Sequence, residues 1–205
     1  MKLFIVMLCN FFPLFSQDNS KNCAEVFKET KKLCLEFDKN LDSISIAKKE
    51  LEALNKLIEL TRKYKDEKLI KKITVFNAEQ LKKIMLHYQW PCIDTFGTDY
   101  DSYAWSIVQQ ANHDQVFQFQ CLMLIRQLAK ENRVSKKNYA YLYDHLAFCS
   151  GLKQRYGTKV VPANGNCEIA PCDASFEIIN ARRTKKGINS IEEYLEKINK
   201  AIQKK

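Results

Sequence analysis

The chain has 205 residues, enough for one ordinary domain with a substantial core and a helical extension. Its net charge of +9 comes mainly from lysine, with 27 Lys against 6 Arg, and the lysines alternate with acidic residues in stretches such as KKELEALNKLIEL. Alternation of this kind is typical of solvated helix faces, so the charge does not indicate a partner that is a nucleic acid.

The first 17 residues have the features of a secretory signal peptide. A lysine precedes an apolar run from Leu3 to Phe15, and polar residues follow the run. The run is shorter than the ~20 apolar residues that span a bilayer, and Asn10 and Pro13 interrupt it. We therefore expect cleavage near Gln17 and a secreted or periplasmic protein without a transmembrane segment. The alternative is a buried N-terminal helix.

An N-terminal helical hairpin is predicted over residues 18–72. Apolar residues recur at helical spacing over residues 22–66 without Gly or Pro, and the pattern breaks near DKNLDS. A helical core domain is predicted over residues 73–205. It begins with a helix at NAEQLKKIMLHYQ, for which Asn77 is the predicted N-cap and which Pro91 ends.

Three further helices are predicted next along the chain. The first starts at Thr98-x-x-Asp101, which places an acid in its first turn, and continues through YAWSIVQQAN. Asp114 is the predicted N-cap of the second helix. Ser135 opens the third, and Gly151 follows it as a left-handed C-terminal cap.

The hydrophobic period changes after Gly151. Short β-prone runs flank Asn164-Gly165, a strong hairpin signal, and Pro162 confines one of the strands. This pattern predicts one small β-hairpin near residues 155–170. The fold class is therefore mainly α: a multi-helix domain with one small β-hairpin.

Two helices complete the predicted fold. The first runs from an N-cap at Asp173 to a stop at Gly187, and the second opens with the capping box Ser190-x-x-Glu193.

Cysteine usage permits disulfides in an exported protein but does not require them. Cleavage near Gln17 would leave seven of the eight cysteines, so at least one thiol stays free or pairs between chains. Cys167 and Cys172 flank EIAP in a loop-rich stretch and are the candidate pair. No C-x-x-C or H-E-x-x-H motif occurs, and we predict neither a metal site nor a cofactor.

Several short motifs follow one another in the second half of the chain. They are Trp90-Pro91-x-x-Asp94-x-Phe96-Gly97, Ala104-Trp105 with Gln109, Asp114, Phe117-Gln118, Ala140-Tyr141-Leu142-x-Asp144, Gln154-x-Tyr156-Gly157-Thr158, Pro171, Arg182-Arg183 and Gly187. In this order they resemble an uncharacterised bacterial domain family, a domain of unknown function, over about residues 88–195. The resemblance implies a shared fold and no known activity.

The chain departs from the family pattern at three polar positions. Gln109-Gln110 stands where the family has Gln-His, Asn112 replaces an Asp, and Lys159 follows the Tyr-Gly-Thr. A His in place of Gln110 would be a natural general base near neutral pH, whereas Gln110 cannot take a proton. If the family is enzymatic, this member is altered at that position.

Two residues are candidate general bases. His113 is expected at the end of a helix on the same face as Gln109, although a His there more often caps exposed carbonyls. Asp94 lies in a loop beside aromatic residues, where partial desolvation would raise its pKa; its alternative role is to bind backbone amides of the turn. Asp144 and His145 are neighbours on a helix and do not face each other, so they are not a predicted dyad.

Arg182 and Arg183 stand out because arginine is scarce in this chain. Adjacent residues on a helix diverge by ~100°, so only one of the two is expected to face inward. An inward Arg requires a partner, and Asp94 and Asp144 are the candidates for a structural ion pair. The functional alternative is a clamp for an anionic ligand.

The Gln-x-Tyr-Gly-Thr stretch is expected at a turn from a helix into the hairpin. Gln154, Tyr156 and Thr158 would present hydrogen-bonding groups from a rigid edge, or Tyr156 would bury its ring and tie its hydroxyl to the helices. No base is identified for Thr158 and no G-x-S-x-G motif occurs, so these groups favour recognition over bond breaking.

The leading hypothesis is an exported helical domain that binds a small polar or anionic ligand in a pocket beside this turn. The predicted ligand-binding residues are Asp94, Gln109, Gln110, His113, Gln154, Tyr156, Thr158, Arg182 and Arg183. The first alternative is a hydrolase-like enzyme with Asp94 or His113 as general base. The second is a protein-interaction module that uses the N-terminal helical hairpin, in which the turn is purely structural. No oligomeric state is predicted.

Overall fold

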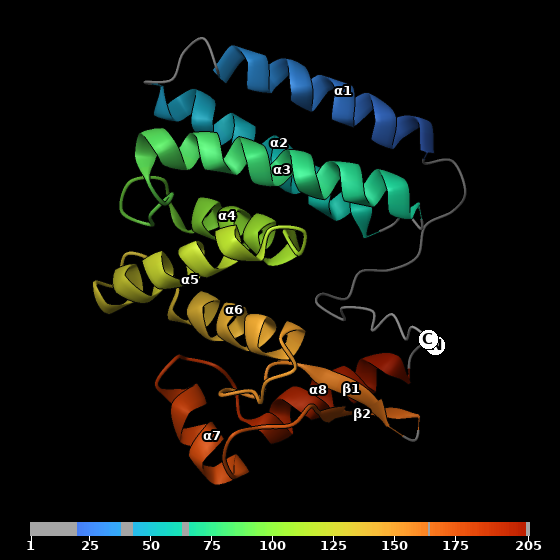
Figure 1. The fold of residues 1–205 in the computed structure, drawn as a ribbon, viewed down its shortest axis with the longest axis vertical. Coiled ribbons are helices and arrows are strands. Elements are labelled where there is room, and N and C mark those ends of the chain that lie inside the picture. Colours follow the sequence, from blue (N-terminus) through green and yellow to red (C-terminus); the bar gives the residue numbers. More distant parts are fainter. Residues whose placement is uncertain (1–19, 38–42, 63–65, 164, 204–205) are drawn as a thin grey trace. The chain divides into compact units, whose positions relative to one another are not determined.

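The structure is a computed structural model that describes residues 20–37, 43–62, 66–163 and 165–203. Within these ranges it is mainly α, as predicted, with eight helices and one two-stranded antiparallel sheet (Figure 1). The predicted signal peptide over residues 1–17 lies outside the described residues. In the part of the chain that is described, no helix has the length and apolar character needed to cross a bilayer.

Packing divides the chain into two compact units, and each is described by itself. Among the described residues, one unit runs from Ser20 to Tyr139 and the other from Ala140 to Gln203. The predicted boundary between residues 72 and 73 falls inside one continuous helix, α3 (Glu67–Tyr88).

The predicted N-terminal helical hairpin is formed by α1 (Ser20–Phe37) and α2 (Ile44–Thr61). Ser43 begins α2, and its hydroxyl accepts a hydrogen bond from the Ile46 N–H at 3.4 Å. The second helix is central, since it packs against α1, α3 and α4 (Thr98–Gln110). Its fully buried side chains include Leu51, Leu54 and Leu57, and each contributes about 1.5–3 kcal/mol by burial.

Helix α3 begins well before the predicted start at Asn77. Asp66 is its N-cap, and the Asp66 carboxylate accepts a hydrogen bond from the Leu69 N–H at 3.0 Å. The prediction that Asn77 caps the helix is wrong. Asn77 is buried in the middle of α3, where its Nδ2 donates to the Leu54 carbonyl oxygen of α2 at 3.1 Å.

Helix α4 begins at Thr98 as predicted, after Gly97, which has a φ of 103°. Asp101 lies in its first turn, but its buried carboxylate serves distant groups. It accepts hydrogen bonds from Trp90 Nε1 at 2.8 Å, the Ser135 N–H at 3.0 Å and Asn138 Nδ2 at 3.1 Å. Asp101 therefore connects the start of α4 to the α3–α4 loop and to the start of α6.

Helices α5 (Gln115–Lys130) and α6 (Lys136–Cys149) follow at the predicted places. Asp114 is confirmed as the N-cap of α5, since its Oδ1 accepts from the Phe117 N–H at 2.9 Å. Gly151 follows α6 with a φ of 71°, which confirms the left-handed cap.

The unit that begins at Ala140 contains the predicted hairpin. Strands β1 (Val160–Ala163) and β2 (Asn166–Ile169) pair antiparallel, with Val160 opposite Ile169. Helix α8 (Ile191–Ile202) packs against β2 and against α7 (Phe176–Thr184).

The predicted caps of these last two helices have different outcomes. Ser190 is confirmed, because its hydroxyl accepts from the Glu193 N–H at 3.2 Å. The prediction that Asp173 caps α7 is wrong, because Ser175 holds that position. The Asp173 carboxylate instead accepts from Arg182 Nη1 at 2.5 Å.

The predicted Cys167–Cys172 disulfide is not formed, since both thiols are free. Cys167 is buried in β2, where its backbone N–H donates to Asn199 Oδ1 at 2.7 Å. Cys172 lies beyond the strand, and its thiol donates to the Ala170 carbonyl at 3.4 Å. The hairpin holds the two cysteines in separate environments, so their closeness in sequence does not bring them into bonding distance.

Candidate functional site

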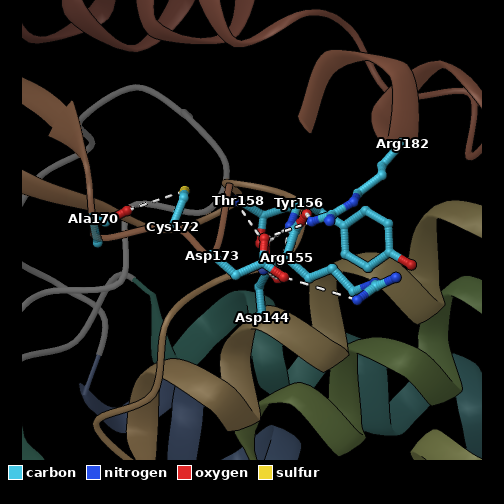
Figure 2. Close-up of polar contacts among 8 residues, drawn as sticks. All are labelled: Asp144, Arg155, Tyr156, Thr158, Ala170, Cys172, Asp173 and Arg182. Carbon is cyan, nitrogen blue, oxygen red and sulfur yellow. Dashed lines mark hydrogen bonds and ion pairs between the residues drawn. The ribbon is translucent and has the colours of Figure 1, made fainter. Parts of the chain in front are cut away.

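The Gln-x-Tyr-Gly-Thr turn is folded around the carboxylate of Asp144, which projects from α6 (Figure 2). The backbone N–H groups of Arg155, Tyr156 and Thr158 donate to this carboxylate at 2.8, 3.1 and 2.9 Å. Asp144 is fully buried, and its burial raises the pKa of the carboxyl group, against the opposing effect of these hydrogen bonds. The carboxylate therefore fixes the backbone of the turn.

Gln154 uses its side chain in the same way. Its Nε2 donates to the carbonyl oxygens of Lys159 and Ala170 at 3.0 and 2.8 Å, and its Oε1 accepts from the Lys159 N–H at 2.6 Å. The residue is fully buried. The Gln154 side chain thus bonds the backbone of Lys159 and Ala170, next to the two strands, as a neighbouring strand would do.

The other two predicted contact residues of the turn are also covered. Tyr156 is 5% exposed, and its ring packs edge-to-face against Tyr143 with centroids 6.0 Å apart. Thr158 is 2% exposed. Both residues are therefore buried.

Arg183 is the inward member of the arginine pair and is fully buried, as the helical geometry predicted for one of the two. The prediction that its partner is Asp94 or Asp144 is wrong. Its Nη1 donates to the carbonyl oxygens of Tyr156 and Gly157 at 2.7 and 3.0 Å. Carbonyl dipoles at the turn therefore take the role expected of a carboxylate.

Arg182 is the outward member of the pair. Its Nη1 donates to Asp173 Oδ1 at 2.5 Å and to the Arg155 carbonyl at 3.1 Å. Arg155 Nη1 lies 3.8 Å from the other Asp173 oxygen, so two guanidinium groups meet one carboxylate on the outside of the turn (Figure 2). Arg155 was not among the predicted site residues, although it stands between Gln154 and Tyr156 and is one of only six arginines.

Asp94 belongs to the other unit and lies on its surface, with 53% of its side chain exposed. Arg133 Nε donates to Asp94 Oδ2 at 3.0 Å, and this hydrogen bond holds the pKa of Asp94 below its usual value. The expectation of a raised pKa is therefore wrong, because the carboxylate is solvated and bound to a cation instead of being desolvated by aromatic rings.

The remaining predicted residues lie near the end of α4. Gln109 is buried and Gln110 half-buried in the last turn of that helix, whereas His113 is exposed in the connection to α5. Because α4 ends at Gln110, His113 is not on the helix face predicted for it. No hydrogen bond or ion pair among the described residues joins Asp94 to Gln109 or His113. Nor does that part of the chain group three or more His, Cys, Asp or Glu side chains so that they could hold a metal ion.

A second candidate surface is a groove between α1 and α3, to which we refer as the α1–α3 groove. Its larger part has a volume of about 540 Å³. A smaller part of about 220 Å³ shares two residues with it, Lys31 and Phe76. The two parts together are lined by Phe27, Lys31, Cys34, Leu35, Lys68, Lys71, Lys72, Val75, Phe76, Gln80 and Lys83.

The floor of the α1–α3 groove is aromatic. The rings of Phe27 and Phe76 pack edge-to-face with centroids 5.1 Å apart. Both rings are half-buried and rest on a core cluster that contains Val26, Leu57 and Ile73. The rings are therefore held from below and remain partly accessible from above.

The rim of the groove is positively charged. Its lining residues include five lysines and neither Asp nor Glu. Lys31 Nζ lies 4.6 Å from the Phe27 ring centroid, within the range of a cation–π contact. Lys31, Lys68, Lys71 and Lys72 make no ion pair within the described ranges, so their charge is not neutralised there.

Comparison with known proteins places the chain in a family. The profile of a family of unknown function (DUF6624) matches residues 65–205. The chain belongs to this family. No curated protein and no solved structure matches the chain.

The match to the DUF6624 family contains the turn but only one wall of the groove. Helix α3 and all later elements lie inside the matched residues, whereas α1 and α2 precede them. The α1–α3 groove is thus built by a family helix and by a helix outside the family match.

The buried side chain of His145 in α6 predicts that the stability of the fold depends on pH. Burial lowers the pKa of His145 to about 3, against about 6.5 in an unfolded chain. Between these values the unfolded chain binds a proton that the folded chain does not, so stability falls as the pH decreases below about 6.5. We expect a loss of about 2 kcal/mol between about pH 6.5 and about pH 5, measured by urea unfolding. A His145→Gln variant should lose most of this pH dependence; an unchanged dependence would contradict the assignment.

Proposed function

We propose that the chain is a protein-interaction module and that the α1–α3 groove is its binding surface. The observation that supports this function best is the composition of the groove, in which half-buried Phe27 and Phe76 lie beneath a rim of lysines without acidic neighbours in the lining. An accessible aromatic floor with a charged border is typical of a surface that recognises another molecule.

The state of the turn favours the same choice. The hypothesis of a ligand pocket there requires Gln154, Tyr156 and Thr158 to offer polar groups to a ligand. The three side chains are buried, and the Gln154 amide is fully engaged with backbone groups. These contacts support a structural role for the turn, as in the interaction-module hypothesis.

Reversing the charge of Lys71 and Lys72 tests the groove directly. We use 1-anilinonaphthalene-8-sulfonate, an aromatic anion that fluoresces in apolar sites, as the probe. The wild-type chain should bind it saturably, and Lys71→Glu/Lys72→Glu should weaken binding by about tenfold, about 1.4 kcal/mol.

Lys136 and Lys137 provide the matched control, because they too are adjacent, exposed helical lysines and they do not line the groove. Lys136→Glu/Lys137→Glu should leave the probe's Kd unchanged. The absence of saturable binding, or equal weakening by both double variants, would exclude the groove as a binding surface.

A second candidate function rests on the exposed arginines. Arg155 and Arg182 meet a single carboxylate, that of Asp173, which leaves one positive charge in excess beside the turn. We propose that a small anion binds at these two arginines. This retains the anionic-ligand part of the ligand-binding hypothesis. Phosphate should then raise the Tm of the wild-type chain, and Arg155→Gln should abolish the shift. An equal shift in both proteins would remove this candidate.

The hydrolase-like alternative keeps Asp94 or His113 as the proposed general base. Asp94 is bound to Arg133, and a lowered pKa weakens a carboxylate as a base. Activity against p-nitrophenyl esters and phosphates that is lost in Asp94→Asn or His113→Gln would support the enzyme. Activity that is equal in both variants and the wild type would exclude Asp94 and His113 as the general base.

Export is proposed from the N-terminal sequence alone. If residues 1–17 are a signal peptide, N-terminal sequencing of the protein expressed at full length should give a mature chain that begins near Asp18. A protein that retains Met1 inside the cell would contradict export.

A further inference from the structure

We infer that the α1–α3 groove accepts an acidic, amphipathic α-helix of a partner protein. This inference rests on the proposed function, because it names the occupant of the same groove. The walls of the groove, its floor and the distribution of its charge support this occupant.

The walls of the groove are two helices. Helix α2 packs against both α1 and α3 (Figure 1). The groove is lined by residues of α1 and α3 alone. The lining residues of α3 extend from Lys68 to Lys83, about 22 Å at ~1.5 Å per residue. A helix of about 15 residues matches this length.

The backbone requirements of the occupant favour a helix over an extended segment. The N–H and C=O groups of α1 and α3 are bonded within each helix along the groove, so the walls offer side chains only. An extended peptide laid across Phe27 and Phe76 would lose water from its backbone groups without gaining partners. A helix bonds its own backbone and projects apolar side chains at i, i+3, i+4 and i+7 toward such a floor.

The floor offers anchor positions at two points. The larger part exposes the paired rings of Phe27 and Phe76, and the smaller part adds Leu35, a residue that is 61% exposed. Because Phe76 and Lys31 border both parts, a single apolar stripe can contact the two in succession.

The distribution of lysines indicates several negative charges on the occupant. Lys31 stands on the α1 side, and on the α3 side Lys68, Lys71 and Lys72 lie toward one end and Lys83 toward the other. Acidic residues that flank an apolar stripe would meet lysines on both sides of the groove. Opposite charges at the border of an interface mainly speed association and select the partner, so binding should weaken with salt.

The same distribution argues against a fatty acid. A small ligand usually has most of its surface enclosed in a concave pocket, and a fatty acid carries a single charge at one end. The α1–α3 groove instead runs past four lysines spread over about 22 Å of α3, and Lys31 of α1 is a fifth.

The experiment measures binding of labelled peptides to the full chain by fluorescence anisotropy. The probes are acidic amphipathic helices of about 15 residues with leucine or phenylalanine at the anchor positions. Three comparison ligands are included: the same peptides with lysine in place of glutamate, scrambled peptides of equal composition, and palmitate. Vesicles of phosphatidylglycerol test for a membrane surface as the source of negative charge.

The acidic amphipathic peptides should bind best, gain helicity on binding and weaken with salt. Lys71→Glu/Lys72→Glu should raise their Kd by about tenfold, and Lys136→Glu/Lys137→Glu should not change it. Preference for the lysine-substituted or scrambled peptides, binding of palmitate or vesicles without the acidic peptides, or an equal response of both double variants would overturn the inference. If the sulfonate probe still binds the groove while the acidic peptides do not, the proposed function survives and the partner class is wrong. If neither binds, both are wrong.

Discussion

Replacing Asp144 with alanine is expected to lower the free energy of unfolding by about 3–5 kcal/mol. The fully buried carboxylate accepts hydrogen bonds from the backbone N–H groups of Arg155, Tyr156 and Thr158. Alanine would leave these donors without their partner and create a cavity. Urea unfolding of the variant and the wild type measures the difference.

Asp173 provides the control for this variant. Its carboxylate also binds the arginines of this region, but a third of the side chain is exposed, so Asp173→Ala should cost less than about 1 kcal/mol. Asp144→Asn should be intermediate, because the amide keeps one acceptor oxygen and the shape of the side chain. If Asp144→Ala costs no more than Asp173→Ala, the carboxylate does not organise the turn.

Replacing Arg183 with methionine is expected to destabilise the chain by about 3 kcal/mol or more. The guanidinium donates to the carbonyl oxygens of Tyr156 and Gly157 and, through Nε, to that of Asn189 at 2.5 Å. It also lies 5.0 Å from the Tyr194 ring centroid. Methionine fills a similar volume but cannot donate, so the carbonyl oxygens of the buried Tyr156 and Gly157 lose their partner.

The neighbouring arginine is a matched control. Arg182 has the same side chain one position earlier on α7, yet it is partly exposed and pairs with Asp173 at the surface. Arg182→Met should therefore cost about 1 kcal/mol or less. Arg183→Lys should not restore stability, since an ammonium group lacks the planar fork that reaches several carbonyls. Equal losses in the two methionine variants, or full rescue by lysine, would show that this network is not what makes Arg183 important.

Helix boundaries were predictable where a signal and its partner are close in sequence. Asp114 and Ser190 each cap the helix that follows, through an N–H three residues later. Asn77 and Asp173 carry the same kind of signal, but distant groups bind them. Asn77 donates to Leu54 on another helix, and Asp173 accepts from Arg182. A residue's preference for caps does not tell which groups the folded chain will bring near it.

The turn shows a second limit of sequence analysis. Gln154, Tyr156 and Arg183 were predicted to line one pocket; all three are buried in the structure, and Arg183 donates to the Tyr156 carbonyl. Their pattern did not reveal whether they face solvent or the backbone. That depends on the path of the chain around Asp144, whose carboxylate accepts from the N–H groups of Arg155, Tyr156 and Thr158.

The α1–α3 groove was not predictable for a related reason. Phe27 and Phe76 each lie in lysine-rich helical stretches that resemble solvated faces. Only the packing of α2 against both α1 and α3 sets the two rings at 5.1 Å and gathers lysines from separate helices around them. In the sequence the lysines alternate with acidic residues, whereas in the fold five lysines line one groove.

The most direct test of the account is hydrogen–deuterium exchange of the full chain with and without an acidic amphipathic peptide. If the groove is the binding surface, protection should increase in α1 around Phe27–Leu35 and in α3 around Lys68–Lys83, and residues 154–158 should be unaffected. Protection that appears instead at residues 154–158 and around Arg182, with α1 and α3 unchanged, would contradict the account and return the function to the turn.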